Sequence, residues 1–193
     1  HIFLVLDLWD SGYHYANFVF HDLDFMDSMW FFATWTANRT GHFLTGLPFG
    51  NTMAGMNFYT GLIVGSLALV SWYFCTKKRH IPALMGFAGE FLALSLCWLP
   101  AAVLYTYLTY AAILLAVIFL YLGLTEKKEL FLFAAGLVLG AGVGVRFSNL
   151  VHMGFILAVW FWGIIDGWKW GGYVRKTLVC MAGYAAAFGG FLG

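Results

Sequence analysis

The chain has 193 residues, of which 62% are hydrophobic, 20% aromatic and 10% charged, and its mean hydropathy is +0.82. A typical soluble domain carries about 25% charged residues, so this composition excludes an ordinary soluble domain. The formal net charge is only +1, and the sequence has no basic stripe that would neutralise a nucleic-acid backbone. The composition therefore predicts an all-α, polytopic membrane protein whose surroundings are a lipid bilayer and which has no nucleic-acid partner.

The apolar segments predict about six membrane spans, because a helix needs about 20 apolar residues to cross a bilayer. Residues 2–6 are a short apolar run that we interpret as the stub of an earlier span. Pro100 separates two spans, since proline disfavours helix in the residue before it. The expected spans are 52–75, 81–98, 101–124, 130–147, 149–166 and 177–193. We interpret residues 1–193 as a single transmembrane domain and as a fragment of a longer protein.

Residues 7–51 form a long polar stretch that contains five of the nine acidic residues. Within it, the segment DSMWFFATWTANRTGHFL has a stripe of mostly apolar residues at helical spacing, with Asp27 or Ser28 as a candidate N-cap of the helix. This stripe predicts a helix that lies in the membrane interface with its aromatic face in the lipid. The glycines and proline of GHFLTGLPFGNTMAG then predict a return into the membrane. The members of the stripe are Met29, Phe32, Ala33, Thr36 and Phe43. We therefore expect 7–51 to be a loop with an interfacial helix, and 52–193 to be a helix bundle.

The basic residues indicate the orientation of the chain. With the spans above, three loops that together hold eight of the ten Lys and Arg residues fall on one face. The positive-inside rule assigns this face to the cytoplasm. The exceptions, Arg39 and Arg146, fall on the opposite face together with residues 7–51, which we expect to be extracytoplasmic. The three basic loops contain Lys77, Lys78 and Arg79, then Lys127 and Lys128, then Lys169, Arg175 and Lys176.

The segment LDLWDSGYHY carries the first group of candidate functional residues. Asp7 and Asp10 stand three residues apart and His14 four further, so a helix through them would place all three on one face. A partly desolvated carboxyl group at a membrane edge suits general-base catalysis. Acids and imidazoles of this stretch are also candidate ligands of a divalent metal ion, although their spacing matches no known metal motif. The alternative is that they only solvate the end of a helix. The metal candidates are Asp7, Asp10, His14, His21, Asp22 and Asp24.

Arg146 is the second candidate, and it follows the glycine-rich run GLVLGAGVGV. Gly136, Gly140 and Gly144 repeat every four residues, which permits close helix packing. Because Arg146 opposes the positive-inside trend, we expect an anion to hold it there. A lipid-linked phosphate and an Asp of the outer loop are both candidates, and snorkelling toward lipid headgroups is the alternative.

Glu90 is the third candidate, in the middle of the expected span 81–98. A carboxylate inside a membrane is by default a hypothesis of function, and a transporter would use it as a proton or ion site. The alternative is a protonated side chain that hydrogen-bonds to a neighbour.

This arrangement resembles the GT-C superfamily of polyprenyl-phosphate-sugar-dependent glycosyltransferases. The shared features are an Asp-bearing outer loop (DLWDSGYHY) after a first span, an interfacial helix in that loop (MWFFATWTANRTGHF) and a bundle with short outer turns. The layout looks most like the bacterial branch related to protein-mannosyltransferases and aminoarabinose transferases, which implies the bacterial cytoplasmic membrane. The resemblance implies a catalytic Asp at Asp7 or Asp10, and a phosphate-holding basic residue that falls on Arg146 by location. The Asp-Glu pair frequent in this family is absent, since Ser11 follows Asp10.

On this resemblance, Asp7 or Asp10 would deprotonate or orient an acceptor hydroxyl, and Arg146 would stabilise the departing polyprenyl phosphate. Further candidates for substrate binding are Tyr13, His14 and Arg39. The implied partners are a polyprenyl-phosphate-linked sugar and an acceptor whose chemical class the sequence does not identify. The candidate cofactor is a divalent metal ion held by Asp10 and His14. Two other functions stay open, namely a transporter that uses Glu90 and a non-catalytic membrane assembly protein.

Overall fold

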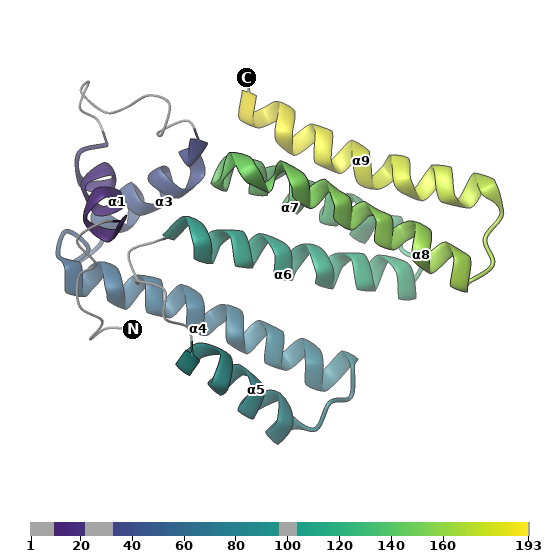
Figure 1. Ribbon diagram of the computed structural model, residues 1–193, viewed down its shortest axis with the longest axis horizontal. Coiled ribbons are helices and arrows are strands. Elements are labelled where there is room, and N and C mark those ends of the chain that lie inside the picture. The colour runs from purple at the N-terminus through teal and green to yellow at the C-terminus, as the bar shows by residue number, and fades with distance from the viewer. Residues whose placement is uncertain (1–9, 22–32, 97–103, 193) are drawn as a thin grey trace. The chain divides into compact units, whose positions relative to one another are not determined.

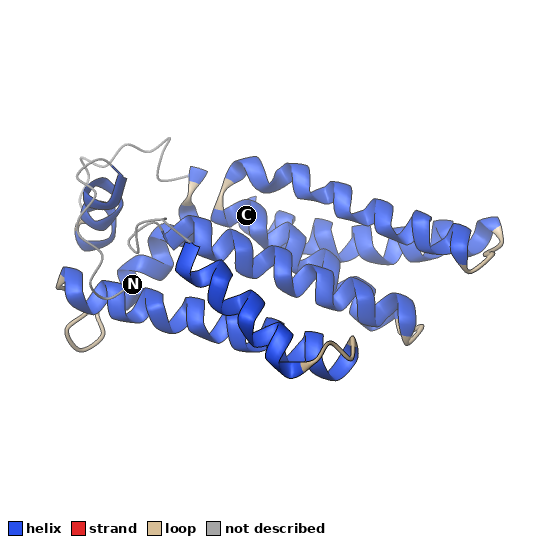
Figure 2. Cartoon of the chain, turned by 60° about the horizontal axis from the view of Figure 1, so that its bottom comes forward, coloured by secondary structure: helices blue, strands red, loops and turns tan. Residues whose placement is uncertain are grey.

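The computed structural model describes residues 10–21, 33–96 and 104–192, and every regular element in these ranges is a helix (Figures 1 and 2). The prediction of an all-α fold is therefore confirmed for the described residues. The elements are α1 (Asp10–Val19), α3 (Trp35–Thr45), α4 (Met53–Lys78), α5 (Ala83–Leu96), α6 (Leu104–Thr125), α7 (Glu129–Val145), the 3-10 helix η1 (Phe147–Ile156), α8 (Leu157–Ile165) and α9 (Trp170–Leu192).

A helix occupies each of the six segments that the sequence marks as a span. Three helices are both long and apolar enough to cross a membrane, namely Met53–Lys78, Leu104–Thr125 and the continuous stretch Phe147–Ile165. Ala83–Ala93 and Glu129–Val145 are apolar but shorter. The structure is thus compatible with a membrane protein that has three spanning helices, and six crossings stay a prediction.

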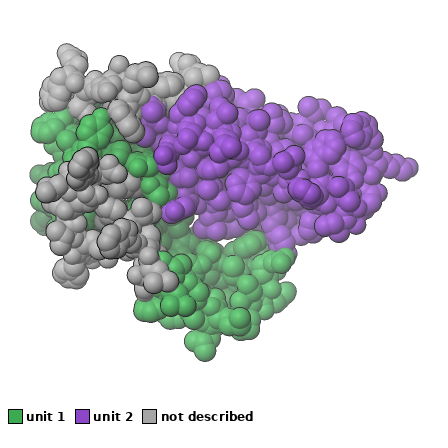
Figure 3. All heavy atoms as spheres, viewed as in Figure 1, with its two compact units in different colours: residues 1–31, 37–107 green, residues 32–36, 108–193 purple. Residues whose placement is uncertain are grey.

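The chain divides into two compact units, residues 1–31 with 37–107 and residues 32–36 with 108–193 (Figure 3). The described part of the first unit contains α1, most of α3, α4 and α5. The second unit contains most of α6 together with α7, η1, α8 and α9.

In the first unit, α1 and α3 pack on each other. Gly41 of α3 lies against the ring of Phe18, where an added Cβ would come within 2.3 Å of a ring carbon, so only glycine fits. The Nδ1 atom of His42 lies 3.0 Å from the carbonyl oxygen of Phe18, and the Tyr15 hydroxyl donates to the carbonyl of Asn51. The packed face of α3 follows the helical repeat and consists of Ala37, Asn38, Gly41 and Leu44.

The predicted interfacial helix is described from α3 onward, while its expected N-cap at residues 27–28 lies outside the described residues. Phe43, the last residue of the predicted stripe, lies outside the packed face and is 66% exposed. A ring at this position is available for lipid, as the prediction requires. The same helix nevertheless uses another face to pack on α1, which the apolar stripe did not predict.

The turn after α3 leads directly into α4, as the glycines and proline there predict. Thr52 is the N-cap of α4, and its hydroxyl accepts a hydrogen bond from the Gly55 backbone N–H at 3.1 Å. An added Cβ on Gly50 would lie 1.9 Å from the Leu44 carbonyl oxygen, so the turn needs glycine at this point. The Tyr59 hydroxyl donates to the Pro48 carbonyl at 2.9 Å, which ties α4 back to the turn.

In the second unit, α7 and α9 run side by side (Figure 1). A Cβ added to Gly136 would lie 1.9 Å from the Cys180 carbonyl oxygen, and one added to Gly140 would lie 2.4 Å from that of Tyr184. The predicted close packing is therefore confirmed at these two glycines. Such contact matters in a bilayer because lipid tails are as apolar as the side chains, so dispersion contacts must favour helix association. The surrounding core consists of Ala116, Leu120, Leu124, Leu132, Ala135, Leu139, Val143, Ile156, Val159, Cys180 and Tyr184.

Ion pairs hold two basic loops together at one end of the second unit. The Lys127 ammonium lies 3.7 Å from a carboxylate oxygen of Asp166, and the Arg175 guanidinium lies 2.9 Å from a carboxylate oxygen of Glu129. The connection between α6 and α7 and the connection between α8 and α9 therefore meet at the same end. This placement agrees with the sequence analysis, which assigns both loops to one face.

Candidate functional site

The segment that holds the candidate acids is described in part. Asp7, Asp22 and Asp24 lie outside the described residues, and Asp10 is the first residue of α1. His14 therefore stands one helical turn after Asp10 on the same helix, as the spacing predicts.

His14 and its neighbour Tyr13 differ in their surroundings. The His14 side chain is only 4% exposed, and its ring centroid lies 4.8 Å from that of Tyr105. The ring of Tyr13 meets the His14 ring edge-on, with centroids 5.8 Å apart. Tyr13 itself is 42% exposed. His14 thus packs among aromatic rings, whereas Tyr13 is accessible to a ligand. Within the described residues, no group of three or more His, Cys, Asp or Glu side chains could hold a metal ion.

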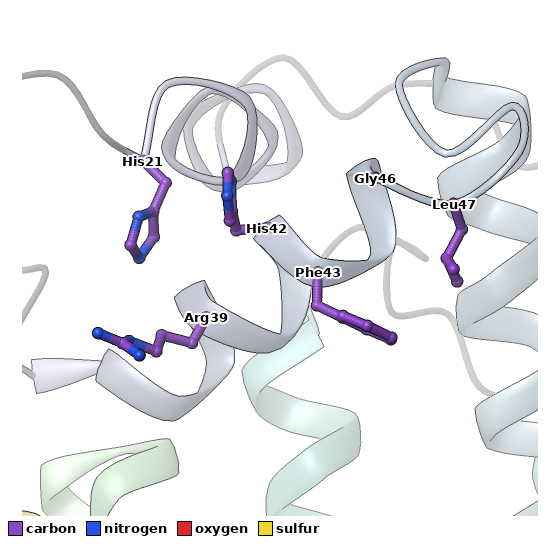
Figure 4. Close-up of a pocket in the computed structure, with 6 residues that line it drawn as sticks. All are labelled: His21, Arg39, His42, Phe43, Gly46 and Leu47. Atoms are coloured by element: carbon purple, nitrogen blue, oxygen red, sulfur yellow. The ribbon is translucent and has the colours of Figure 1, made fainter.

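A pocket of about 630 Å³ lies between the end of α1 and α3 (Figure 4). In this view the two imidazoles and the Arg39 guanidinium lie to one side, while Phe43 and Leu47 lie to the other. The part of the lining that the structure describes therefore combines basic side chains with apolar surface. The pocket is lined by His21, Arg39, His42, Phe43, Gly46 and Leu47.

The two histidine rings of this pocket are stacked. Their centroids are 4.6 Å apart and their planes differ by 28°. Imidazole nitrogens direct their lone pairs within the plane of the ring, so two stacked rings do not aim both at one metal ion. The nearby guanidinium of Arg39 also opposes a bound cation.

Arg146 lies at the turn between α7 and η1, in the second unit, and its side chain is exposed. The turn is held by Asn149, which is only 4% exposed. Its side-chain amide donates to the Gly142 carbonyl at 2.9 Å and to the Thr109 hydroxyl oxygen at 2.8 Å. The predicted break at residues 146–149 is therefore confirmed, and a buried amide fixes its geometry.

The turn at Arg146 reverses the chain and places this residue far from the basic loops. Helix α7 has 17 residues, which corresponds to a length of about 26 Å at 1.5 Å per residue. Lys127 and Glu129 lie at its start, where Asp166 returns to pair with Lys127. Arg146 therefore lies at the opposite end of the unit from those loops, as the sequence analysis expects.

Glu90 borders a groove of about 290 Å³ between α4 and α5. The lining surface of this groove is entirely apolar, so Glu90 contributes methylene groups to it rather than its carboxylate. The Trp72 indole N–H donates to the Ala83 carbonyl at 3.0 Å and joins the two helices nearby. Among the residues that the structure describes, this groove offers no polar group to an ion. It is lined by Gly65, Ala68, Leu69, Trp72, Phe87, Glu90 and Phe91.

Of the predicted site residues, Asp10, Tyr13 and His14 share α1, while Arg39 lies in the pocket of the same unit. The prediction did not include His42, which lines the same pocket as Arg39. Their spacing of three residues on one helix was a signal that they share a face. The approach of His21 to His42 depends on how α1 packs on α3, and no sequence pattern encodes it.

Compared with protein-family models, curated proteins and solved structures, the chain matches none of them. The functional argument therefore depends on the residues and their geometry.

Proposed function

We propose that this chain belongs to a membrane glycosyltransferase that moves a sugar from a polyprenyl-phosphate carrier to an acceptor on the extracytoplasmic face. The single observation that supports it most is the position of Arg146. An exposed guanidinium stands at the end of the second unit opposite the basic loops, on a turn held by a buried amide. A planar, permanently charged group in such a place suits the phosphate of a lipid carrier.

The proposal uses six membrane crossings, one for each helix from α4 to α9, with η1 and α8 counted together. The basic loops are then cytoplasmic, and α1, α3 and Arg146 are extracytoplasmic in a bacterial cytoplasmic membrane. The short helices α5 and α7 fit this scheme if the bilayer thins locally around them.

In the proposed reaction, the acceptor oxygen forms a bond to the anomeric carbon while the bond from that carbon to the phosphate oxygen breaks. The acceptor proton passes to the carboxylate of Asp7 or Asp10. The polyprenyl phosphate leaves with an additional negative charge, and Arg146 stabilises that charge. The exposed ring of Tyr13 is placed to stack on a sugar, while the enclosed ring of His14 favours a role in positioning α1 over one in metal binding.

The transporter alternative has less support. A transporter of this kind needs a helix broken at the membrane midplane beside a polar site. The candidate interruption GAGVGVRFS forms a chain reversal at the end of α7, and the groove beside Glu90 is lined by apolar surface.

Substitution of the two acids tests the proposal. In the protein in its membrane, Asp7→Asn or Asp10→Asn should lower sugar transfer roughly 100- to 10,000-fold, the usual contribution of a general base. Glu90→Gln is the matched control and should keep transfer near the wild-type level. Equal abundance of all variants in the membrane excludes a folding defect. Full transfer in both Asp variants, or loss of substrate uptake in Glu90→Gln alone, would refute the proposal.

Substitution of Arg146 tests the phosphate role. Arg146→Ala should raise the KM for the lipid donor, and Arg146→Lys should restore part of the affinity because the charge persists while the two-pronged contact is lost. Titration of the donor on purified, folded protein measures both effects. An unchanged KM in Arg146→Ala would remove the main support for the transferase.

A further inference from the structure

The end of the second unit where the connection from α6 to α7 meets the connection from α8 to α9 has no part in the reaction proposed above. We propose that Lys169 and Lys176, together with the tryptophan rings beside them, bind the phosphate headgroup of an anionic phospholipid. This inference goes beyond sugar transfer and does not depend on it, because it concerns the end of the unit opposite Arg146.

This surface lies at the end of a helical stretch that can cross a membrane. The continuous stretch Phe147–Ile165 is long and apolar enough to do so. Ten of its residues form a 3-10 helix, which rises about 2.0 Å per residue, and nine form an α-helix, which rises about 1.5 Å, so the stretch is about 34 Å long. The hydrocarbon core of a bilayer is about 30 Å thick. Asp166 and the residues that follow it therefore fall at the level of the lipid headgroups.

A cluster of aromatic rings marks the same level. The ring centroid of Tyr173 lies 5.3 Å from that of Trp160 and 5.8 Å from that of Trp168. Trp170 adds a third indole, whose centroid lies 5.6 Å from that of Trp160, and it is 69% exposed. Tryptophan concentrates at membrane interfaces because its ring is apolar while its N–H needs a polar partner. The cluster therefore supports a headgroup position for this end of the unit.

The turn after α8 holds Trp168 in one position. Gly167 has a φ of 65°, which glycine adopts without steric cost, and the Trp168 backbone N–H donates to the Gly163 carbonyl at 3.0 Å. The indole N–H of Trp168 donates to the Asp166 carboxylate at 2.7 Å. The face of the indole receives the Lys176 ammonium, which lies 4.2 Å from the ring centroid. Lys176 is therefore held in place before a lipid binds, which lowers the entropy that binding would cost.

The basic groups of this end outnumber the acidic groups. Residues 126–129 and 166–176 hold five Lys and Arg residues and three acids, so their net charge is +2. Each of the three acids has a basic partner, which leaves the excess charge on Lys169 and Lys176. The pairs, with their N–O distances, are Lys128 with Glu126 at 3.1 Å, Arg175 with Glu129 at 2.9 Å and Lys127 with Asp166 at 3.7 Å.

The two remaining lysines lack a full countercharge in the protein. Asp166 attracts Lys176 more weakly than it attracts Lys127, and the face of an indole leaves an ammonium group its charge. Lys169 is exposed and, within the described ranges, takes part in no ion pair, hydrogen bond or ring contact. A phosphate at the level of the headgroups would supply the missing negative charge.

Apolar residues beside the lysines indicate that the phosphate belongs to a lipid. Trp170, Val174 and Leu178 stand four residues apart on α9 and therefore share one face of the helix. Trp170 is 69% exposed and Leu178 is 62% exposed, and α9 leads away from this end alongside α7. An acyl chain can lie along this face while its phosphate meets the lysines, whereas a free phosphate would make no use of the face.

A fluorophore on a single cysteine measures which lipid gathers at this surface. With the native cysteines replaced by alanine, Gly171→Cys places the label near Lys169, at a position where nothing lies within 4 Å of an added Cβ. The protein is placed in nanodiscs of phosphatidylcholine with a minor fraction of phosphatidylglycerol. An equal amount of one lipid or the other carries bromine on its acyl chains, which quenches the label.

We expect the quenching to show a local excess of phosphatidylglycerol over phosphatidylcholine of up to about 25-fold, because each lysine near an anionic lipid contributes about fivefold. Added salt should lower this excess by screening. Equal quenching by the two brominated lipids would overturn the proposal.

Substitutions separate a site from attraction by net charge. Lys169→Gln and Lys176→Gln should each lower the excess of phosphatidylglycerol about fivefold, whereas Lys176→Arg should retain it because the charge persists. Lys128→Gln is the matched control, because it removes one positive charge at the same end from a residue that pairs with Glu126. It should lower the excess less than either substitution of the proposed site. An equal loss in Lys128→Gln would show attraction by net charge alone and would refute the site.

A competing anion tests whether the phosphate belongs to a lipid. Inorganic phosphate and chloride at equal ionic strength should lower the excess of phosphatidylglycerol to the same extent, because both act only by screening. A larger effect of inorganic phosphate would show that the lysines hold a free phosphate, and would refute the assignment to a phospholipid.

Discussion

Gly136→Ala tests the contact between α7 and α9. The added Cβ would lie 1.9 Å from the Cys180 carbonyl oxygen, so α9 must move by about 1 Å to reach 3.0 Å, the shortest distance a Cβ tolerates. Overpacking costs about 1–3 kcal/mol, and an overlap with backbone belongs near 3 because the backbone cannot rotate away. Alanine recovers roughly 0.5–1 kcal/mol through its helix preference. We therefore expect a net loss of about 2 kcal/mol in the free energy of unfolding.

Equilibrium unfolding in mixed micelles, followed by tryptophan fluorescence, measures this loss. Gly189→Ala is the matched control, because nothing lies within 4 Å of an added Cβ at this position of α9. It should be neutral or stabilising by about 0.5–1 kcal/mol. If both variants unfold with the wild-type free energy, α7 and α9 are further apart in the membrane than the structure shows, and the reasoning is refuted.

Three further predictions concern the second unit and the orientation of the chain. Asn149→Ala should lower the free energy of unfolding by about 1–3 kcal/mol, because it removes two hydrogen bonds of a buried amide, to the Gly142 carbonyl and the Thr109 hydroxyl, each worth about 0.5–1.5 kcal/mol. Unfolding in mixed micelles measures this loss. The hydrogen bond from the Trp168 indole N–H, together with the charge of Lys127, holds the pKa of Asp166 below its usual range. The folded state is therefore stabilised above the usual pH range of carboxyl titration, and this stabilisation disappears as the pH falls through the folded-state pKa. In Trp168→Phe the pKa of Asp166 should rise, which a carboxyl NMR titration measures. With the native cysteines replaced by alanine, a cysteine at Pro48 should react with an impermeant thiol reagent from outside and one at Lys128 should not, and the reverse pattern would contradict the orientation.

The positions of the helices could be predicted from the sequence because long apolar runs end at charges or at glycine and proline. The break at Arg146 and the approach of α7 to α9 at Gly136 also follow from local patterns, since both depend on residues close in the chain or on glycines at a fixed spacing. The face by which α3 packs on α1 could not be predicted. It contains Asn38, which is fully buried, and a search for apolar periodicity assigns a polar residue to the other side of the helix.

In the candidate sites, the charged residues could be predicted from the sequence, whereas the residues that position them could not. Arg146 and Arg39 stand out in a sequence with so few charges, but their surroundings depend on side chains that no charge pattern identifies. The geometry of the Arg146 turn depends on the buried amide of Asn149, and the pocket beside Arg39 depends on Gly41, which lets α3 approach the ring of Phe18. The position of the His42 ring likewise depends on a carbonyl contributed by α1. A charged residue in an apolar sequence therefore marks a candidate site, while its packing partners determine the geometry of that site.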